Sequence, residues 1–225
     1  MPLHEIFDAR HDADTGARLF TCGDIHGCYD ELMAGLDAIG FDKTRDHLLA
    51  LGDLVDRGPK NLEVLALLDE PWFHSIRGNH EELTFCAAES KEAVRFHVQN
   101  GGQWFADLDD DERNRIAQTL RALPLAMTVY TATGGKYGLV HADLPFASWD
   151  STIEALEHHE VQKYVSWKRE NIRRAQAGHE LGGIWNVDAV YMGHTPVDEP
   201  VRSANMNWID TKCFRTGVLT IEELK

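Results

Sequence analysis

Six short segments of the chain carry residues that bind metals or phosphate, and most of them sit beside a glycine directly after an apolar run. In chain order they are Gly23-Asp24-Ile25-His26-Gly27, Gly52-Asp53-Leu54-Val55-Asp56-Arg57-Gly58, Gly78-Asn79-His80-Glu81, His141-Ala142, Trp167-Lys168-Arg169 and Gly193-His194-Thr195. Oxygen and imidazole ligands that converge from several strand ends suit a pair of divalent metals. Two such ions with arginines nearby favour phosphoryl hydrolysis.

The ligand types in these segments narrow the choice of metal. Two aspartates, one asparagine and three histidines form a mixed oxygen and nitrogen set without thiolates, which disfavours a structural zinc cage and suits manganese, iron or zinc. Asp53 begins the central segment and is the candidate for a carboxylate that bridges two ions about 4 Å apart. A single Gly-Asp or Gly-Asn turn is equally typical of an ordinary loop, but the whole series in this order is not.

The charge of the chain excludes one class of function and raises a question about another. A net charge of −15 argues against general nucleic-acid binding, which requires a basic surface. A negative molecule would also repel a phosphate ester at long range. At contact distance, two divalent ions with Arg57 and Arg169 would outweigh Asp24 and Asp53, because salt screens charges beyond about 8 Å.

Composition also bears on the compartment in which the protein works. No apolar run approaches the roughly 18 residues that span a bilayer, and four acidic residues among the first twenty argue against a signal peptide. We therefore expect a cytoplasmic protein without a membrane segment. Cys22, Cys28, Cys86 and Cys213 form no Cys-x-x-Cys pair and are expected to be free thiols. Oxidation of Cys22 or Cys28 could disturb the segment between them, although both also fit small buried residues.

The elements that must position the polar segments begin with a β-α-β-α-β pattern. Apolar runs predict strands at 19–22, 48–51 and 73–76, and helical spacing predicts helices over 32–39 and 62–68. Gly40 and Pro71 end the two helices. The alternation predicts parallel strands with helical crossovers, and ligands usually lie at the carboxyl ends of such strands.

The remaining two thirds of the chain change from helical to largely β character. The expected elements are helices over 80–97 and 110–123 separated by Asn100-Gly101-Gly102, a β-hairpin over 125–131 and 137–140, a polar helical stretch over 152–177, and strands at 190–192, 208–209 and 218–221. We find no repeat and no linker. The sequence therefore predicts a single α/β domain over residues 1–225, with two facing sheets covered by helices.

The segments resemble those of the phosphoprotein phosphatase superfamily of metallophosphoesterases, which carry the same series GDIHG, GDLVDRG, GNHE, His-Ala and Gly-His-Thr. They are most similar to the branch of the bacteriophage lambda protein phosphatase and its bacterial relatives. That resemblance runs from Leu19 to the end and includes Asn100-Gly101-Gly102 and Trp167-Lys168-Arg169-Glu170. It implies a β-sandwich of two facing mixed sheets flanked by helices.

The resemblance also implies roles for individual residues. Asp24, His26 and Asp53 would hold the first metal, and Asp53, Asn79, His141 and His194 the second. Arg57 and Arg169 would grip the phosphate oxygens. His80 would protonate the leaving alcohol, and Asp56 would orient its ring. Two divalent ions, with Mn²⁺ as the first expectation and Fe or Zn as alternatives, would lower the pKa of a bound water so that hydroxide attacks directly.

The implied activity is hydrolysis of phosphoserine and phosphothreonine monoesters in phosphoproteins or phosphopeptides, with phosphotyrosine as a further candidate. A symmetrical dinucleoside tetraphosphatase is the nearest alternative, but such relatives tend to carry Ala at the position of Asp56 and Asp at that of Glu81. A phosphodiesterase or nucleotidase would generally lack Arg57. A non-catalytic phosphopeptide-binding protein would not need the full set of ligands. The sequence does not predict the oligomeric state.

Several of these residues have simpler interpretations. His80 could cap the helix that follows it, and Arg57 could pair with Asp56. Arg169 lies beside Lys168 on a polar helix, where charged side chains are usually solvated. Three tryptophans could belong to the core or line the site: Trp104, Trp149 and Trp185.

One segment departs from the pattern of these relatives. After Ile209-Asp210-Thr211, Lys212-Cys213 stand where they usually carry Gly and a small residue. If that position takes a positive φ, Lys212 is strained.

Overall fold

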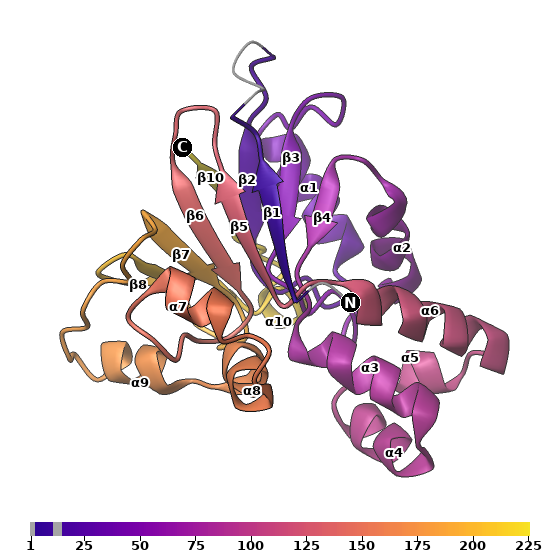
Figure 1. Ribbon diagram of the computed structural model, residues 1–225. Helices are drawn as coiled ribbons and strands as arrows, with labels where there is room; N and C mark the ends of the chain where they lie inside the picture. Colours follow the sequence, from indigo (N-terminus) through magenta and orange to yellow (C-terminus); the bar gives the residue numbers. More distant parts are fainter. Residues whose placement is uncertain (1–2, 11–14) are drawn as a thin grey trace.

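Two mixed β-sheets face each other in the computed structural model, which describes residues 3–10 and 15–225 (Figure 1). The larger sheet has the strand order β1-β5-β6-β7-β9-β8, and the smaller has the order β10-β2-β3-β4. The strands are β1 (His4–Asp8), β2 (Leu19–Cys22), β3 (His47–Ala50), β4 (Phe73–Ser75), β5 (Ala126–Tyr130), β6 (Lys136–Val140), β7 (Ala189–Met192), β8 (Val201–Ser203), β9 (Met206–Trp208) and β10 (Ile221–Leu224). The predicted fold class is confirmed.

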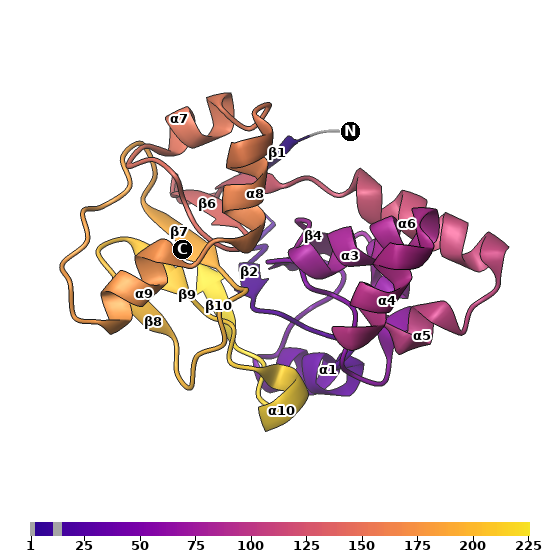
Figure 2. The ribbon, with the colours of Figure 1, turned by 90° about the horizontal axis from the view of Figure 1, so that it is seen from below.

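Helices cover the outer faces of both sheets. They are α1 (Tyr29–Ala38), α2 (Asn61–Ala66), the 3₁₀ turn η1 (Leu67–Asp69), α3 (Asn79–Glu89), α4 (Lys91–Gln99), α5 (Gln103–Ala106), α6 (Asp110–Ala122), α7 (Trp149–Glu154), α8 (His159–Trp167), α9 (Glu170–Gln176) and α10 (Cys213–Thr216). Figures 1 and 2 show α7 to α9 on one side of the sheets and α3 to α6 on the other. Within the described ranges, no helix is long and apolar enough to cross a membrane.

The β-α-β-α-β pattern forms the smaller sheet as predicted. Strands β2, β3 and β4 are parallel, and β10 adds to β2 in the antiparallel direction. Leu48 and Ala50 of β3 face α1 and α2, whereas Leu49 faces the larger sheet. Because the strand is buried on both faces, it appears in the sequence as a continuous apolar run.

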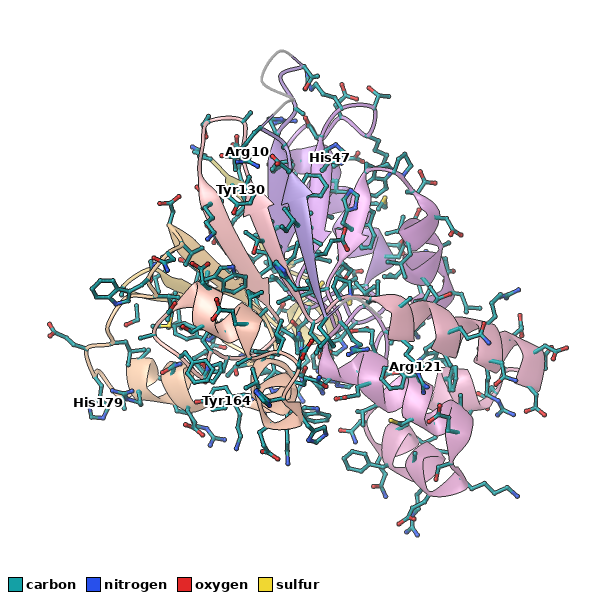
Figure 3. All side chains as sticks on the ribbon, in the orientation of Figure 1. Arg10, His47, Arg121, Tyr130, Tyr164 and His179 are labelled. Carbon is teal, nitrogen blue, oxygen red and sulfur yellow. The ribbon has the colours of Figure 1, made fainter. Side chains whose placement is uncertain are left out.

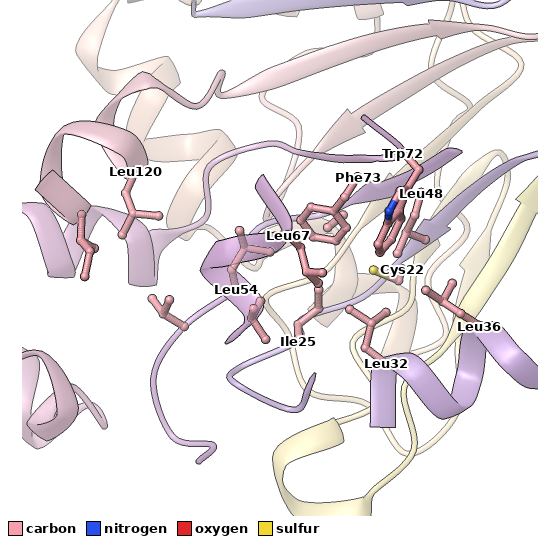
Figure 4. Packing of buried hydrophobic residues seen from close by; sticks show 14 of the residues in the cluster. Cys22, Ile25, Leu32, Leu36, Leu48, Leu54, Leu67, Trp72, Phe73 and Leu120 are labelled. Carbon is pink, nitrogen blue, oxygen red and sulfur yellow. The ribbon is translucent and has the colours of Figure 1, made fainter. Parts of the chain in front are cut away.

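Three apolar clusters hold the layers together. The first packs the smaller sheet against α1, α2 and α6, with Leu32, Leu36 and Trp72 among its members (Figure 4). The second packs the larger sheet against α7, α8 and α9, and Trp149 lies at its centre. The third fills the space between the sheets and includes Val129. These clusters hold the strand ends, from which the candidate site residues project, in fixed relative positions.

Two of the predicted helical stretches are interrupted. The stretch predicted over 80–97 breaks at Ser90, whose extended backbone (φ −142°, ψ 128°) ends α3 and whose side chain accepts a hydrogen bond from the Ala93 N–H at the start of α4. Serine favours this capping position over a helix interior. The polar stretch predicted over 152–177 is likewise divided among α7, α8 and α9.

The edge strands were the least predictable elements. Strand β1 pairs in parallel with β5 and was missed, because its sequence HEIFD is half exposed and lacks a clear apolar alternation. Arg10, just after β1, stacks on Tyr130 of β5 with its guanidinium carbon 4.4 Å from the ring centre (Figure 3). The short strand β8 was also missed, and the last strand lies at 221–224 rather than 218–221. The predicted hairpin of β5 and β6 is confirmed.

Candidate active site

The six predicted metal ligands all follow the carboxyl ends of strands and lie close together. Asp24 and His26 follow β2, Asp53 follows β3, Asn79 follows β4, His141 follows β6 and His194 follows β7. All six side chains are buried. His26, Asp53 and His194 have positive φ angles of 48°, 49° and 63°, which side chains with a Cβ rarely adopt. Such strain persists where the surrounding structure enforces it, and it is common at functional sites.

Asp53 stands between two groups of potential ligands. Its Oδ2 lies 3.6 Å from His26 Nε2, and its Oδ1 lies 3.3 Å from His141 Nε2. Asn79 Oδ1 is 2.9 Å from the same His141 nitrogen. Among the residues that the structure describes, potential ligand atoms within 4.8 Å of one another form two groups, one of Asp53 with His26 and His80 and one of Asp53 with His141 and His194. The two carboxylate oxygens therefore face two separate sites.

Glu81 fixes the loop that carries Asp53. Its buried carboxylate accepts hydrogen bonds from the backbone N–H groups of Asp53, Leu54 and Gly78, at 2.8, 2.8 and 2.7 Å. Burial and the nearby Asp53 raise the pKa of Glu81 to about 7, although the N–H donors favour its charged form. The side chain thereby joins the start of α3 to the end of β3.

Backbone carbonyls orient the three histidines. The Nδ1 atoms of His26 and His141 donate to Val55 O (2.8 Å) and Leu51 O (2.7 Å), so that Nε2 remains to bind a ligand. His194 is turned the other way, because its Nε2 donates to Trp167 O at 3.1 Å and leaves Nδ1.

The three histidines differ in charge. Burial lowers the pKa of His26 to about 3 and that of His194 to about 2, so both rings are neutral at pH 7 and can bind a metal. Burial would lower the pKa of His141 as well, but the carboxylates of Asp53 and Asp24 raise it to about 10. Burial, Asp210 and Asp53 raise the pKa of Asp24. Buried carboxylates at this density need cations close by.

The donor set and the close backbone approach to its carboxylates fit two divalent ions. A Cβ on Gly78 would lie 2.3 Å from Asp53 Oδ1, and one on Gly193 would lie 2.1 Å from Asp24 Oδ1, so these glycines are required where the backbone approaches the carboxylates. Imidazole nitrogens, carboxylates and one amide oxygen suit Mn, Fe or Zn. The assignment of individual ligands stays a prediction, and the grouping of His80 with His26 and Asp53 leaves His80 as a further candidate ligand.

His80 and Asp56 form a hydrogen-bonded pair beside the ligands. His80 Nδ1 donates to Asp56 Oδ2 at 2.7 Å, and His80 Nε2 lies 3.9 Å from Asp53 Oδ2. Burial would raise the pKa of Asp56, but the hydrogen bonds from His80 and His97 lower it. A charged carboxylate behind an imidazole is the arrangement that orients a general acid or base. His80 does lie in the first turn of α3, but its side chain is used in this pair.

The two predicted phosphate-binding arginines also reach the site. The Arg57 guanidinium donates to His26 Nε2 (2.6 Å) and His80 Nε2 (2.8 Å) rather than to the Asp56 carboxylate, so the simple ion-pair interpretation is not supported. An ion on His26 Nε2 and this guanidinium would exclude each other, so binding of the ion would require Arg57 to move. Arg169 is half-buried before α9, where its Nη2 approaches His194 O at 3.5 Å.

Known proteins are similar to this chain in sequence. Residues 17–198 match the sequence model of the calcineurin-like phosphoesterase family. The chain belongs to that family. This calcineurin-like phosphoesterase is 33% identical over its full length to serine/threonine-protein phosphatase 1 of Salmonella typhimurium, which it also covers completely. It is 34% identical over 150 residues to the symmetrical bis(5'-nucleosyl)-tetraphosphatase of Methylococcus capsulatus, covering 66% of this chain and 50% of that protein.

The fold of this phosphoesterase is also found among solved structures. A protein serine/threonine phosphatase from Saccharomyces cerevisiae aligns with a TM-score of 0.61 and 17% identity, covering 93% of this chain and 71% of that one. At that identity the likeness concerns the fold.

Several contacts in this phosphoesterase site were not predicted. Phe214 of α10 packs edge-on against His26, with ring centres 5.3 Å apart, and lies 4.8 Å below the Arg57 guanidinium. The three tryptophans that could belong to the core or to the site lie in different places. Trp149 is buried in the core, Trp185 is 72% exposed, and Trp104 donates a hydrogen bond to Asp56 at the site. No periodicity signals such contacts, because each comes from an element distant in the sequence.

The turn before α10 adopts the strained geometry expected from its sequence. Lys212 has φ 60° and ψ 44°, in the left-handed region that favours glycine. Cys22, Cys28 and Cys213 are buried free thiols, and Cys86 is partly exposed. The burial of Cys22 and Cys28 agrees with their interpretation as small core residues.

Proposed function

We propose that the protein is a dinuclear-metal phosphatase that hydrolyses phosphoserine and phosphothreonine monoesters of proteins. The observation that carries the proposal is the position of Asp53, whose two oxygens face two ligand groups. The full-length similarity to a serine/threonine-protein phosphatase supports the substrate class. We further propose Mn²⁺ as the metal and the cytoplasm as the compartment. We also propose that residues 1–225 form one domain, since Asp24 and His194 enter the same site from distant parts of the chain.

The roles of the residues follow from their contacts. Asp24, His26 and Asp53 would hold one ion, and Asp53, Asn79, His141 and His194 the other. When bound, two such ions supply an activated water and neutralise charge on the ester. Arg57 and Arg169 would bind the phosphate oxygens and stabilise the charge that spreads over them in the transition state. As Arg57 turns to the phosphate, it releases His80 Nε2 from the present hydrogen bond.

His80 would then protonate the departing oxygen. Its Nδ1–H donates to Asp56, which keeps the ring in one orientation and stabilises a proton on Nε2. The serine or threonine alkoxide is a poor leaving group, so this proton is needed at the moment when the ester bond breaks.

A second candidate is hydrolysis of dinucleoside tetraphosphates, because relatives with that name share at least 30% identity with this chain. The residue types at two positions favour the phosphatase instead. Glu81 joins the Asp53 loop to α3 and Asp56 supports His80, whereas tetraphosphatase relatives tend to carry Asp and Ala at these positions.

The test compares rates of manganese-loaded protein on phosphoserine, phosphothreonine and phosphotyrosine peptides and on diadenosine tetraphosphate. We expect the first two peptides to be preferred, and chelator to abolish turnover of any of them. Preference for the tetraphosphate would replace the proposal with the second candidate, and activity unaffected by prolonged chelation would refute the metal mechanism.

A further inference from the structure

Helix α4 buries one side chain completely, and that side chain is polar. His97 is 1% exposed, whereas the other residues of α4 are half-exposed or exposed. Its Nε2 lies 2.8 Å from Asp56 Oδ1 and 3.0 Å from Asp56 Oδ2. An apolar residue would serve if the position only needed filling, so the imidazole is better explained by its contact with the carboxylate.

Trp104 of α5 completes the set of donors to Asp56. Its indole Nε1–H donates to Oδ1 at 2.7 Å, on the opposite side of the carboxylate from His80, which donates to Oδ2. The backbone N–H of Asp56 donates to Asn61 Oδ1 at 2.7 Å. Asp56 is therefore held by three side-chain donors and at its backbone, in a left-handed conformation with φ 75°.

The turn Asn100-Gly101-Gly102 brings these two donors to the carboxylate. A Cβ on Gly102 would lie 2.3 Å from the His97 ring, so no other residue leaves room for it. Gly101 has φ +106°, and a Cβ there would lie 2.7 Å from the Arg57 backbone nitrogen. The Arg57 N–H donates to Gly101 O at 3.3 Å. This segment thus packs directly against Asp56 and Arg57.

A second contact links His97 to the helix that carries His80. Thr84 Oγ1 lies 3.1 Å from His97 Nε2, and the Thr84 hydroxyl donates to the His80 carbonyl oxygen at 2.8 Å. His97 therefore contacts both the carboxylate behind the His80 ring and a residue bonded to the His80 backbone.

We infer that His97 and Trp104 are positioning residues that hold the Asp56 carboxylate in place, so that His80 Nε2 is aimed at the departing oxygen of the ester. The inference rests on the proposed function. It also gives the Asn100-Gly101-Gly102 segment a role, which is to bring His97 and Trp104 to the Asp56 carboxylate. Neither side chain would touch the substrate. Their effect should be confined to proton transfer, and therefore to esters whose leaving group needs a proton.

The test uses two aryl esters that differ in leaving group. Phenyl phosphate releases a basic phenolate, whereas 2,4-dinitrophenyl phosphate releases an ion that needs no proton. In Trp104→Phe and His97→Leu, kcat on phenyl phosphate should fall about 10- to 100-fold, which is part of the roughly 10²- to 10⁴-fold that general acid catalysis supplies. On the dinitrophenyl ester it should change by less than about 2-fold. His97→Gln, which retains an N–H donor, should recover part of the loss.

Trp72→Phe provides the matched control. Trp72 is a buried tryptophan that donates to Glu70 at 3.1 Å, outside the candidate site, so its replacement should slow neither ester selectively. A second control combines Trp104→Phe with His80→Asn. If Trp104 acts through His80, it should add little to the loss in His80→Asn. Equal slowing of both esters by Trp104→Phe, or a fully additive loss in the double variant, would overturn the inference.

A measurement without turnover separates this inference from the proposed function. In magnesium-loaded protein, the His80 Nδ1 proton bonded to Asp56 should give a low-field proton resonance. We expect it to shift or broaden by exchange in Trp104→Phe and to stay unchanged in Trp72→Phe. An unchanged resonance in Trp104→Phe would overturn the inference. Wild-type protein inactive on both esters and on the phosphoserine and phosphothreonine peptides would refute the proposed function, and the resonance would then decide the role of Trp104 by itself.

Discussion

At the scale of single residues, the site depends on side chains held in unfavourable backbone conformations. Asp56 and Arg57 are consecutive left-handed residues with φ 75° and 68°, and Asp53 is left-handed three residues earlier. Each such conformation costs about 1–2 kcal/mol. Gly101 and Asn61 bond the backbone here, and Glu81 bonds the backbone at Asp53. The strain is therefore offset by contacts that also aim the functional side chains.

His80→Asn should separate the general acid from the metal ligands. Because His80 bonds to Asp56 through Nδ1, its loss should slow turnover of phosphoserine peptides about 10²- to 10⁴-fold while the metal content stays at the wild-type level. Turnover and elemental analysis of the purified variant check this. Loss of one ion per molecule from the variant would instead show that His80 is a metal ligand, in agreement with its position close to His26 and Asp53.

Residue types and their order predicted that the six candidate metal ligands converge, because each follows a strand end within a few residues. They did not predict Phe214 or His97 and left Trp104 open between the core and the site; these side chains reach the site from α10, α4 and α5. Those contacts depend on how helices pack, and no local pattern specifies that packing. Arg169 was recognised by resemblance alone, since its surroundings in sequence are those of a solvated charge.

At the scale of elements, the turn into α10 is the clearest local conflict between sequence and backbone. Lys212 caps the N-terminus of α10 in a conformation suited to glycine, and its ammonium pairs with Asp198 on the surface. Asp198 is almost fully exposed, so this ion pair adds little. The strain should therefore dominate the stability of this turn.

Lys212→Gly is expected to stabilise the protein. Relief of the left-handed strain should exceed the entropy that glycine adds to the unfolded chain, for a net gain of about 0.5–1 kcal/mol and a rise in Tm of about 1–4 °C. Thermal unfolding followed by calorimetry measures this. Lys212→Ala, which loses the ion pair but keeps the Cβ, serves as the control and should not raise Tm. A lower Tm for Lys212→Gly would show that the lysine makes a contact worth more than the strain.

The junction between α1 and β3 gives a stability term that depends on pH. Burial would raise the pKa of Asp46, but the Arg18 guanidinium and the backbone N–H groups of Asp42 and Arg18 lower it to about 2 from 3.8. A depressed carboxylate pKa stabilises the fold above the unfolded value, and this contribution is lost as pH falls through the folded value. Asp46→Asn should therefore cost up to about 2 kcal/mol near pH 7.

The difference in unfolding free energy between wild type and Asp46→Asn should shrink steadily from about pH 4 to pH 2. Urea unfolding in the presence of chelator measures it without a contribution from bound metal. A difference that stays constant over this range would mean that the stability comes from packing rather than from the charge of Asp46.

The elements with strong apolar patterns were predicted, and the others were not. The parallel strands of the smaller sheet are buried on both faces and appear as apolar runs, whereas β1 and β8 are exposed edge strands with mixed sequences. The break between α3 and α4 was missed because Ser90 interrupts a spacing that otherwise continues.

At the scale of the whole molecule, both halves of the chain are needed to build one site. The smaller sheet supplies Asp24 and Asp53, and the larger sheet supplies His141 and His194. A hydrogen bond from Trp167 Nε1 to Glu82 Oε2 at 2.8 Å joins the two sides next to the ligands. The overall charge of −15 opposes the approach of an anion, so binding depends on cations concentrated at this one place.

Anomalous scattering from crystals grown with Mn²⁺ tests the central claim most directly. We predict two manganese peaks about 3.5–4 Å apart, each within bonding distance of a different oxygen of Asp53. Both peaks should weaken in Asp53→Asn and persist in Asp110→Asn, which removes an exposed carboxylate on α6. One peak alone, or two peaks that do not touch Asp53, would contradict the account.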